Sequence, residues 1–272
     1  MPSDQRDFGG YVGIYKNPSD VLTCYSGFIY WLPPDADKQT VPFLYPLSGL
    51  TCTDEKDPQK ATDYRLGDEL GTAVVYWETS PRGNRVADDF MYDIGTGAGF
   101  YNEAPHNPYR DHYKLWDYVQ DELPKWYEAH FPLNIKTDPQ GHSMGGHGAL
   151  DADPDHPNRY RSVSAFDTLQ NPLDCPWGKK AFDIYLGAPG EIWKNQRACD
   201  NIRDATYWLP NGLDQGNSPG FLPKSLRNYA LLTDNPWYVG PLQNKDTRGY
   251  DHSYPQLKRE LPKHLRFLQD TN

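Results

Sequence analysis

The sequence predicts an α/β fold with a mostly parallel central sheet flanked by helices. Short, nearly continuous apolar runs alternate with segments that place apolar residues at helical spacing. This order is typical of strands that are buried on both faces and covered by helices. The 272 residues contain no internal repeat, low-complexity tract or long linker. We therefore expect one domain that spans residues 1–272.

Four apolar runs predict strands of this sheet. Phe28–Leu32 is aromatic and β-branched, and two prolines stop it. Val41–Leu47 is a second run, although it contains two prolines of its own. Ala73–Trp77 and Ser162–Phe166 are the third and fourth runs. Their lack of polar alternation favours strands with both faces covered.

Two segments predict helices that pack on the sheet. Tyr113–His130 carries apolar residues at near-helical spacing, and Pro124 is expected to kink or split it. Leu257–Leu268 carries four leucines on one stripe and again contains a proline, Pro262. The aromatic fraction of 14% is high, so tyrosine and tryptophan have to provide much of the core.

Composition excludes several classes of partner. The net charge of −10 argues against nucleic acid or an anionic membrane surface, since both require a cationic face. No apolar stretch is long enough for a transmembrane helix, and the first ten residues lack the apolar core of a secretory signal. The four cysteines are dispersed, so we expect reduced thiols, a cytoplasmic setting and no metal site. Nothing in the sequence calls for an organic cofactor.

The segment Gly141–Gly145 matches the pattern G-x-S-x-G, with Ser143 at its centre. In such a pattern a sharp strand-to-helix turn exposes the serine hydroxyl to a base, and the small flanking residues avoid clashes. The helix that starts near Met144 aims its free N–H groups at a developing oxyanion. The pattern predicts Ser143 as a nucleophile and the Met144 N–H as an oxyanion donor, within an α/β-hydrolase fold.

The candidate base is His252, which lies in a turn-rich segment and follows the serine in chain order. Hydrolases of this fold require that order. A surface histidine in a loop is an equally good interpretation of the residue taken alone.

Several blocks of the sequence resemble one family. They include 47–55, 79–83, 95–101, 141–150, 171–172 and 175–182. Taken together, in this order, they are similar to the S-formylglutathione hydrolases, also called esterase D, from about residue 25 to residue 255.

The resemblance implies hydrolysis of S-formylglutathione to formate and glutathione, a step of formaldehyde detoxification. It also implies activity on small acyl esters and a cytoplasmic, often dimeric protein. By position, Ser143 corresponds to the nucleophile and His252 to the general base. The backbone N–H groups of Leu50 and Met144 correspond to the oxyanion donors. Cys52 lies beside the Leu50 loop, where a small buried hydrophobe is the simpler interpretation.

The block 175–182 contains candidates for substrate binding. Trp177 and Lys179, with Lys180 beside it, lie in a segment shared with the family, and a lysine could meet a glutathione carboxylate. A solvated surface pair of lysines explains the same sequence equally well.

The third member of the expected triad is missing. The family has its acid at the second aspartate of D-Q-G-x-x-D-x-F-L, and this sequence has Pro219 there. Asp214 survives five residues earlier and is a weak candidate, with Asp234 and Asp246 as further alternatives. Without an acid, a Ser–His dyad is expected to retain sharply reduced activity. A non-catalytic small-molecule binder is therefore the rival function.

Other features depart from the family or favour a third function. A central strand leading to Ser143 would contain the charged and proline-bearing segment 136–140, which is hard to accommodate. The helix after it is interrupted near residues 151–154, and the strand expected over 207–212 is broken by a proline. Tryptophans in polar surroundings, among them Trp177 and Trp193, would also suit a carbohydrate-binding or feruloyl-esterase-like protein.

Overall fold

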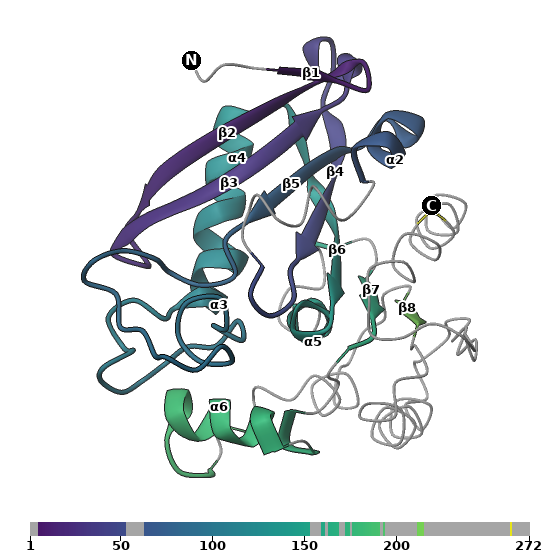
Figure 1. The fold of residues 1–272 in the computed structure, drawn as a ribbon. Coiled ribbons are helices and arrows are strands. Elements are labelled where there is room, and N and C mark those ends of the chain that lie inside the picture. The colour runs from purple at the N-terminus through teal and green to yellow at the C-terminus, as the bar shows by residue number, and fades with distance from the viewer. Residues whose placement is uncertain are drawn as a thin grey trace.

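The computed structural model describes residues 5–52, 63–152, 159–160, 163–168, 172–174, 176–190 and 211–214, together with Trp193 and Pro262. Over these residues the chain forms one eight-stranded sheet with the order β1-β2-β3-β5-β4-β6-β7-β8. Figure 1 shows the strongly twisted sheet, with the N-terminal strands along one side.

The first half of the sheet is antiparallel. Its strands are β1 (Gln5–Asp7), β2 (Gly10–Ser19), β3 (Cys24–Leu32) and β5 (Ala73–Trp77). β2 and β3 form a long hairpin, and β3 pairs with β5 antiparallel through Phe28 and Trp77. The predicted strand over residues 28–32 is confirmed as the inner part of β3, and the one over residues 73–77 is confirmed with the same bounds.

The second half is parallel and carries the Ser143 segment. Its strands are β4 (Val41–Leu47), β6 (Leu133–His142), β7 (Val163–Phe166) and β8 (Asn211–Asp214). β4 has the predicted bounds and accommodates both of its prolines, while β7 confirms the predicted fourth strand from its second residue onward. The carboxyl ends of these strands meet at one edge, which is where α/β sheets place their sites.

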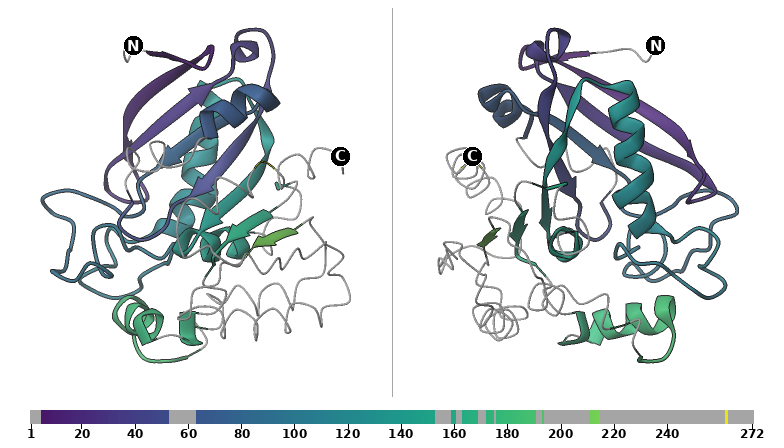
Figure 2. Two further views of the ribbon diagram at one scale, coloured as in Figure 1. Left: turned by 45° about the vertical axis from the view of Figure 1, so that its right-hand side comes forward. Right: turned by 180° about the vertical axis from the view of Figure 1, so that it is seen from behind.

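Helices cover both faces of the sheet. The elements are η1 (Pro34–Asp37), α2 (Asp63–Leu70), α3 (Leu115–Asp117), the π-helix η2 (Tyr118–Glu122), α4 (Leu123–His130), α5 (Met144–Asp151), η3 (Pro172–Asp174) and α6 (Pro176–Leu186). One apolar cluster joins α4, α5 and α6 to the sheet, and a second, around Trp31 and Tyr76, includes Leu66 of α2. Figure 2 shows α4 and α2 on opposite faces. In the described part of the chain, no helix is both long and apolar enough to cross a membrane.

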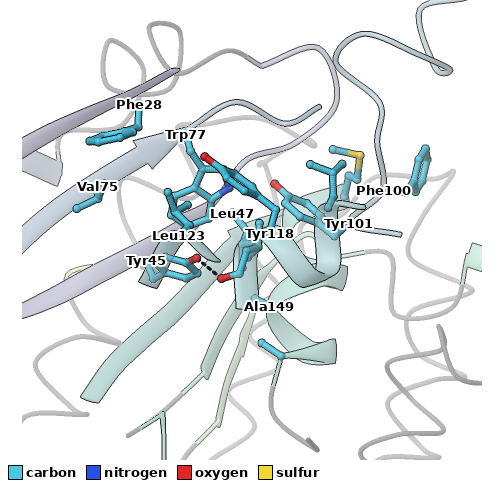
Figure 3. Close-up of a cluster of buried hydrophobic side chains, with 14 of the residues drawn as sticks. Phe28, Tyr45, Leu47, Val75, Trp77, Phe100, Tyr101, Tyr118, Leu123 and Ala149 are labelled. Atoms are coloured by element: carbon cyan, nitrogen blue, oxygen red, sulfur yellow. Dashed lines mark hydrogen bonds between the residues drawn. The ribbon is translucent and has the colours of Figure 1, made fainter. Parts of the chain in front are cut away.

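The core under α4 is built from aromatic side chains, as the composition predicts. Figure 3 shows Phe28, Tyr45, Trp77 and Tyr118 packed together. The ring centroids of Tyr45 and Trp77 lie 4.0 Å apart, and those of Phe28 and Tyr127 lie 5.2 Å apart with an edge-on geometry. Burial raises the pKa of Tyr45 and Tyr127 well above the usual value, so both stay neutral.

The helix predicted over residues 113–130 is observed over residues 115–130, and it changes pitch before Pro124. The turn Tyr118–Glu122 is a π-helix, in which the Leu123 N–H donates to the Tyr118 carbonyl. In an α-helix the Val119 carbonyl would accept from the Leu123 N–H, which donates to Tyr118 instead, and the Gln120 carbonyl would accept from residue 124, where proline has no N–H. The Tyr45 hydroxyl donates to the Val119 carbonyl and Arg159 donates to that of Gln120. The proline is therefore accommodated by a wider turn and two side-chain donors.

The strand β6 shows how the segment 136–140, expected to be hard to accommodate in a central strand, is accommodated there. β6 runs unbroken through Pro139, between β4 and β7. The Thr137 N–H donates to the backbone carbonyl of Arg159, on the β7 side, at 3.3 Å. N–H groups alternate along a strand, so the nitrogen of Pro139 also faces the β7 side. Ladder pairing with β7 begins only at Gln140, so the missing N–H of Pro139 breaks no ladder bond.

The C-terminal expectations are only partly within the described residues. Of the strand expected over 207–212, residues 207–210 lie outside the described residues, and residues 211 and 212 belong to β8 (Asn211–Asp214), which pairs with β7. The helix α5 ends at Asp151 after two turns, as predicted. The helix predicted over 257–268 lies outside the described residues, apart from Pro262.

Candidate active site at the carboxyl edge of the sheet

Ser143 occupies a sharp turn between the end of β6 and the first residue of α5. Its backbone has φ 59° and ψ −118°, a left-handed conformation that is strained for a residue with a side chain. The Ser143 N–H donates to the carbonyl of Phe166 on β7 at 2.9 Å, which fixes the turn to the neighbouring strand. This is the strand-to-helix turn that the sequence pattern predicts.

Two glycines of the pattern are required by close backbone contacts. A Cβ atom on Gly141 would lie 2.0 Å from the carbonyl oxygen of Gly145, across the turn. A Cβ atom on Gly145 would lie 1.7 Å from the carbonyl oxygen of Leu47, at the end of β4. Neither distance is possible for a real side chain, so these glycines allow α5 to start directly against the sheet.

The loop after β4 lies beside the serine. A Cβ atom on Gly49 would lie 3.4 Å from the Ser143 Cβ. The Cys52 N–H donates to the Gly49 carbonyl at 3.4 Å, and the Thr51 N–H donates to Gly97 at 2.7 Å. The two predicted oxyanion donors are the next residues along the chain from this contact, because Leu50 follows Gly49 and Met144 follows Ser143. The loop and the helix start therefore border the serine from two sides.

An aromatic contact braces the same loop. The Tyr101 hydroxyl donates to the Ser48 carbonyl at 2.9 Å, and its ring lies against Gly148 of α5, where a Cβ would approach it within 2.7 Å. Cys52 is buried, and its carbonyl accepts a hydrogen bond from the Thr79 hydroxyl at 2.7 Å. These contacts agree with the interpretation of Cys52 as a small buried residue.

The candidate substrate-binding residues lie on α6. Trp177 is half-buried against Phe100, with ring centroids 5.7 Å apart, and Lys179 is exposed. Lys180 differs from its neighbour, because its Nζ lies 2.6 Å from Oδ1 of the buried Asp93. The charge of Lys180 is thus compensated within the protein, and that of Lys179 faces solvent. Trp193, which suggested a sugar-binding surface, is buried against Phe182 instead.

The remaining predicted residues are only partly described. His252 and Pro219 lie outside the described residues, as do Asp234 and Asp246. Asp214 is the last residue of β8 and pairs in register with Phe166, so its backbone lies at the same edge of the sheet as Ser143, two strands away.

Two buried histidine–carboxylate pairs near the serine were not anticipated. His142 Nε2 lies 3.9 Å from Oδ2 of Asp167, and His147 Nε2 lies 3.2 Å from Oδ2 of Asp151. Burial lowers the pKa of His147 to about 4, so this ring is neutral at pH 7. The sequence offered one signal for Asp167: an aspartate placed directly after a short strand that ends in Ala165 and Phe166.

Comparison with known proteins agrees with this geometry. The model of the family named Esterase matches residues 19–266. An S-formylglutathione hydrolase from Paracoccus denitrificans is 41% identical over 266 residues, which cover 97% of this chain and 95% of the relative.

Solved structures extend the comparison. An S-formylglutathione hydrolase from Agrobacterium tumefaciens superposes with a TM-score of 0.92 at 34% identity, covering 98% of both chains. A ferulic acid esterase superposes with a TM-score of 0.67 at 16% identity, covering 96% of this chain and 98% of the esterase. The second likeness shows the shared fold alone, which is the α/β-hydrolase fold. On this evidence, the chain belongs to the Esterase family and, within it, to the S-formylglutathione hydrolase family of serine esterases.

Proposed function

We propose that the protein hydrolyses S-formylglutathione to formate and glutathione, and that it also hydrolyses small acyl esters. The observation that carries the proposal is the left-handed turn at Ser143, set between the start of α5 and the Gly49 loop. The relatives from Paracoccus denitrificans and Agrobacterium tumefaciens, named as S-formylglutathione hydrolases, support the choice of substrate.

In the first half of the proposed reaction, the Ser143 oxygen attacks the formyl carbon while His252 takes the hydroxyl proton. The carbonyl oxygen becomes an oxyanion and accepts hydrogen bonds from the N–H groups of Leu50 and Met144. The carbon–sulfur bond then breaks, and the glutathione thiolate takes the proton from the imidazolium. The products of this half are glutathione and a formylated serine.

In the second half, water attacks the formyl carbon and gives a proton to the same imidazole. The oxyanion forms again at the same two N–H groups, and the bond from the carbon to the Ser143 oxygen breaks. Ser143 recovers its proton from His252, and formic acid leaves and gives its remaining proton to solvent, which yields formate. An ordinary ester follows the same path with an alcohol as the first leaving group.

For substrate recognition, we assign Trp177 and Lys179 to the glutathione portion. Lys179 faces solvent and is available to a carboxylate. The half-buried Trp177 packs against Phe100, and the next residue, Tyr101, donates a hydrogen bond to Ser48 in the loop beside Ser143. We further propose a single domain over residues 1–272, a cytoplasmic protein acting in formaldehyde detoxification, and a homodimer.

Pro219 favours a second candidate function, a binding protein that retains the fold but has lost turnover. With proline at the family's acid position, and with Asp214 as a weak replacement, the proposed triad lacks its usual orienting carboxylate. Removing that acid costs a factor of about 10⁴ in kcat in serine proteases.

A comparison of the wild type with Ser143→Ala separates the two functions. Both proteins are assayed with p-nitrophenyl acetate and with S-formylglutathione, and their thermal unfolding is recorded. The hydrolase proposal expects turnover by the wild type alone, with both proteins folded. Equal rates for the two folded proteins would refute it, and glutathione-conjugate binding without turnover would support the binding protein.

A further inference from the structure

Asp167 is a fully buried carboxylate at the edge of the sheet that carries Ser143. It directly follows β7, and its side chain is 1% exposed. The register pairs His142 with Phe166, so Ser143 and Asp167 are the next residues on two adjacent parallel strands. Adjacent strands lie about 4.8 Å apart, which places the two residues side by side. The hydrogen bond from the Ser143 N–H to the Phe166 carbonyl joins their backbones.

The position of Asp167 is costly for stability. Its φ of 44° is left-handed, like the 59° of Ser143, and most residues with a side chain avoid this region. A buried ionised carboxylate also loses its hydration, which has to be replaced by interactions within the protein. Strain of this kind tends to gather at functional sites, because stability alone selects against it.

The His142 ring connects this carboxylate to the loop beside the serine. Its Nε2 lies 3.9 Å from Asp167 Oδ2, an electrostatic contact longer than a hydrogen bond. Its Nδ1, across the ring, lies 3.6 Å from where a Cβ on Gly49 would be. That same point is 3.4 Å from the Ser143 Cβ. The imidazole thus lies between Asp167 and the loop.

We propose that Asp167 is a positioning residue for hydrolysis at Ser143, acting through His142. The carboxylate holds the imidazole in one orientation, with its Nε2 edge toward Asp167. The ring in turn holds the Gly49 backbone at the distance from Ser143 at which the following Leu50 N–H can meet the oxyanion. Gly49 has no side chain to anchor it, so its neighbours set this distance. A displacement of about 1 Å at such a donor can cost up to about a hundredfold in rate.

This inference rests on the proposed hydrolase function and is tested by kinetics with p-nitrophenyl acetate. The decisive variant is Asp167→Asn, which keeps the shape, removes the charge and tolerates a left-handed backbone. It is expected to unfold at the same temperature as the wild type or higher. Its kcat should fall by about tenfold to a hundredfold, with KM changed by less than about twofold.

The matched control is Asp151→Asn, which removes the charge of another buried carboxylate beside a histidine, on α5. Its kcat should stay within about twofold of the wild type. His142→Asn and the double variant with Asp167→Asn test the route through the ring. The double variant should be no slower than the slower single variant, because both changes disrupt one interaction.

Two results would overturn the inference: a folded Asp167→Asn with wild-type kcat, or losses that multiply in the double variant. Failure of the hydrolase function itself would look different. In that case the wild type would already be no faster than Ser143→Ala.

Discussion

The turn at Ser143 and the turn at Tyr118–Glu122 both break a rule of regular backbone structure, and they are stabilised in different ways. At Ser143 the left-handed turn is possible because Gly141 and Gly145 have no side chains, so their backbones can lie directly against neighbouring backbone atoms. At the π-helix, Pro124 is accommodated by added donors, the Tyr45 hydroxyl and Arg159. The first arrangement places the buried Ser143 side chain beside the Gly49 loop, and the second restores a packed core.

The comparison predicts that adding an atom at the Ser143 turn is the most damaging change. Gly145→Ala would bring a Cβ within 1.7 Å of the Leu47 carbonyl oxygen, so α5 and β4 have to move apart. We expect a loss of about 3–5 kcal/mol in the free energy of unfolding, together with loss of esterase activity. Urea unfolding and a p-nitrophenyl acetate assay measure the two effects.

The control for that change is Gly71→Ala. Gly71 also has a positive φ, +63°, but nothing lies within 4 Å of the new methyl group. Only the backbone cost of about 1–2 kcal/mol is expected, with activity retained. Equal losses for the two variants would show that close packing at Gly145 is not what holds the turn.

At the π-helix, removing a donor is the damaging change. Tyr45→Phe deletes the hydroxyl that donates to the Val119 carbonyl and leaves that buried carbonyl without it. We expect a loss of about 1–3 kcal/mol, with kcat within about twofold of the wild type. Tyr25→Phe, at a side chain that is 68% exposed, should change stability by less than about 0.5 kcal/mol. A lowered kcat for Tyr45→Phe would mean that the two regions are coupled.

A pH titration of stability probes the buried polar groups near the serine. His147 has a pKa of about 4 when folded and near 6.5 when unfolded, so the unfolded chain binds more protons between these values. Stability should therefore fall as the pH drops from 7 to 5, by about 2 kcal/mol from this residue. The His147→Gln variant should lose less stability over that pH range. An identical pH dependence in the two proteins would place the effect elsewhere.

The smallest effect is expected at the proline itself. Pro124→Ala restores an N–H, but Arg159 and the Tyr45 hydroxyl already donate to the carbonyls of Gln120 and Val119. The free energy of unfolding should change by less than about 1 kcal/mol, as judged by urea unfolding. A gain near the roughly 3 kcal/mol that an unrelieved interior proline costs would contradict the proposed accommodation.

The sequence predicted the parts of the fold that depend on local pattern. The apolar runs gave β4 and β5 with the observed bounds, and the small residues around Ser143 gave the turn. The tolerance of β6 for Pro139 could not be predicted, because it depends on which neighbour each N–H faces. The π-helix could not be predicted for a similar reason, since the side chains that donate to its carbonyls come from residues distant in sequence.

The site residues that belong to a sequence motif were predicted, and those that depend on how the strands pair were missed. Ser143 and the Leu50 loop belong to recognisable blocks, and the structure brings the Gly49 end of that loop beside the serine. Asp167 belongs to no motif, and only the register of β6 with β7 places it next to Ser143. The contribution of His252 stays a prediction.

The central claim, that the Ser143 hydroxyl is the nucleophile, is tested most directly by covalent labelling. The protein is incubated with diethyl p-nitrophenyl phosphate, which phosphorylates activated serines, and the labelled peptide is identified by mass spectrometry. We predict one label per chain, on Ser143, with loss of esterase activity in proportion to labelling. Activity that survives in Ser143→Ala, or a label on another residue that tracks inactivation, would contradict the account.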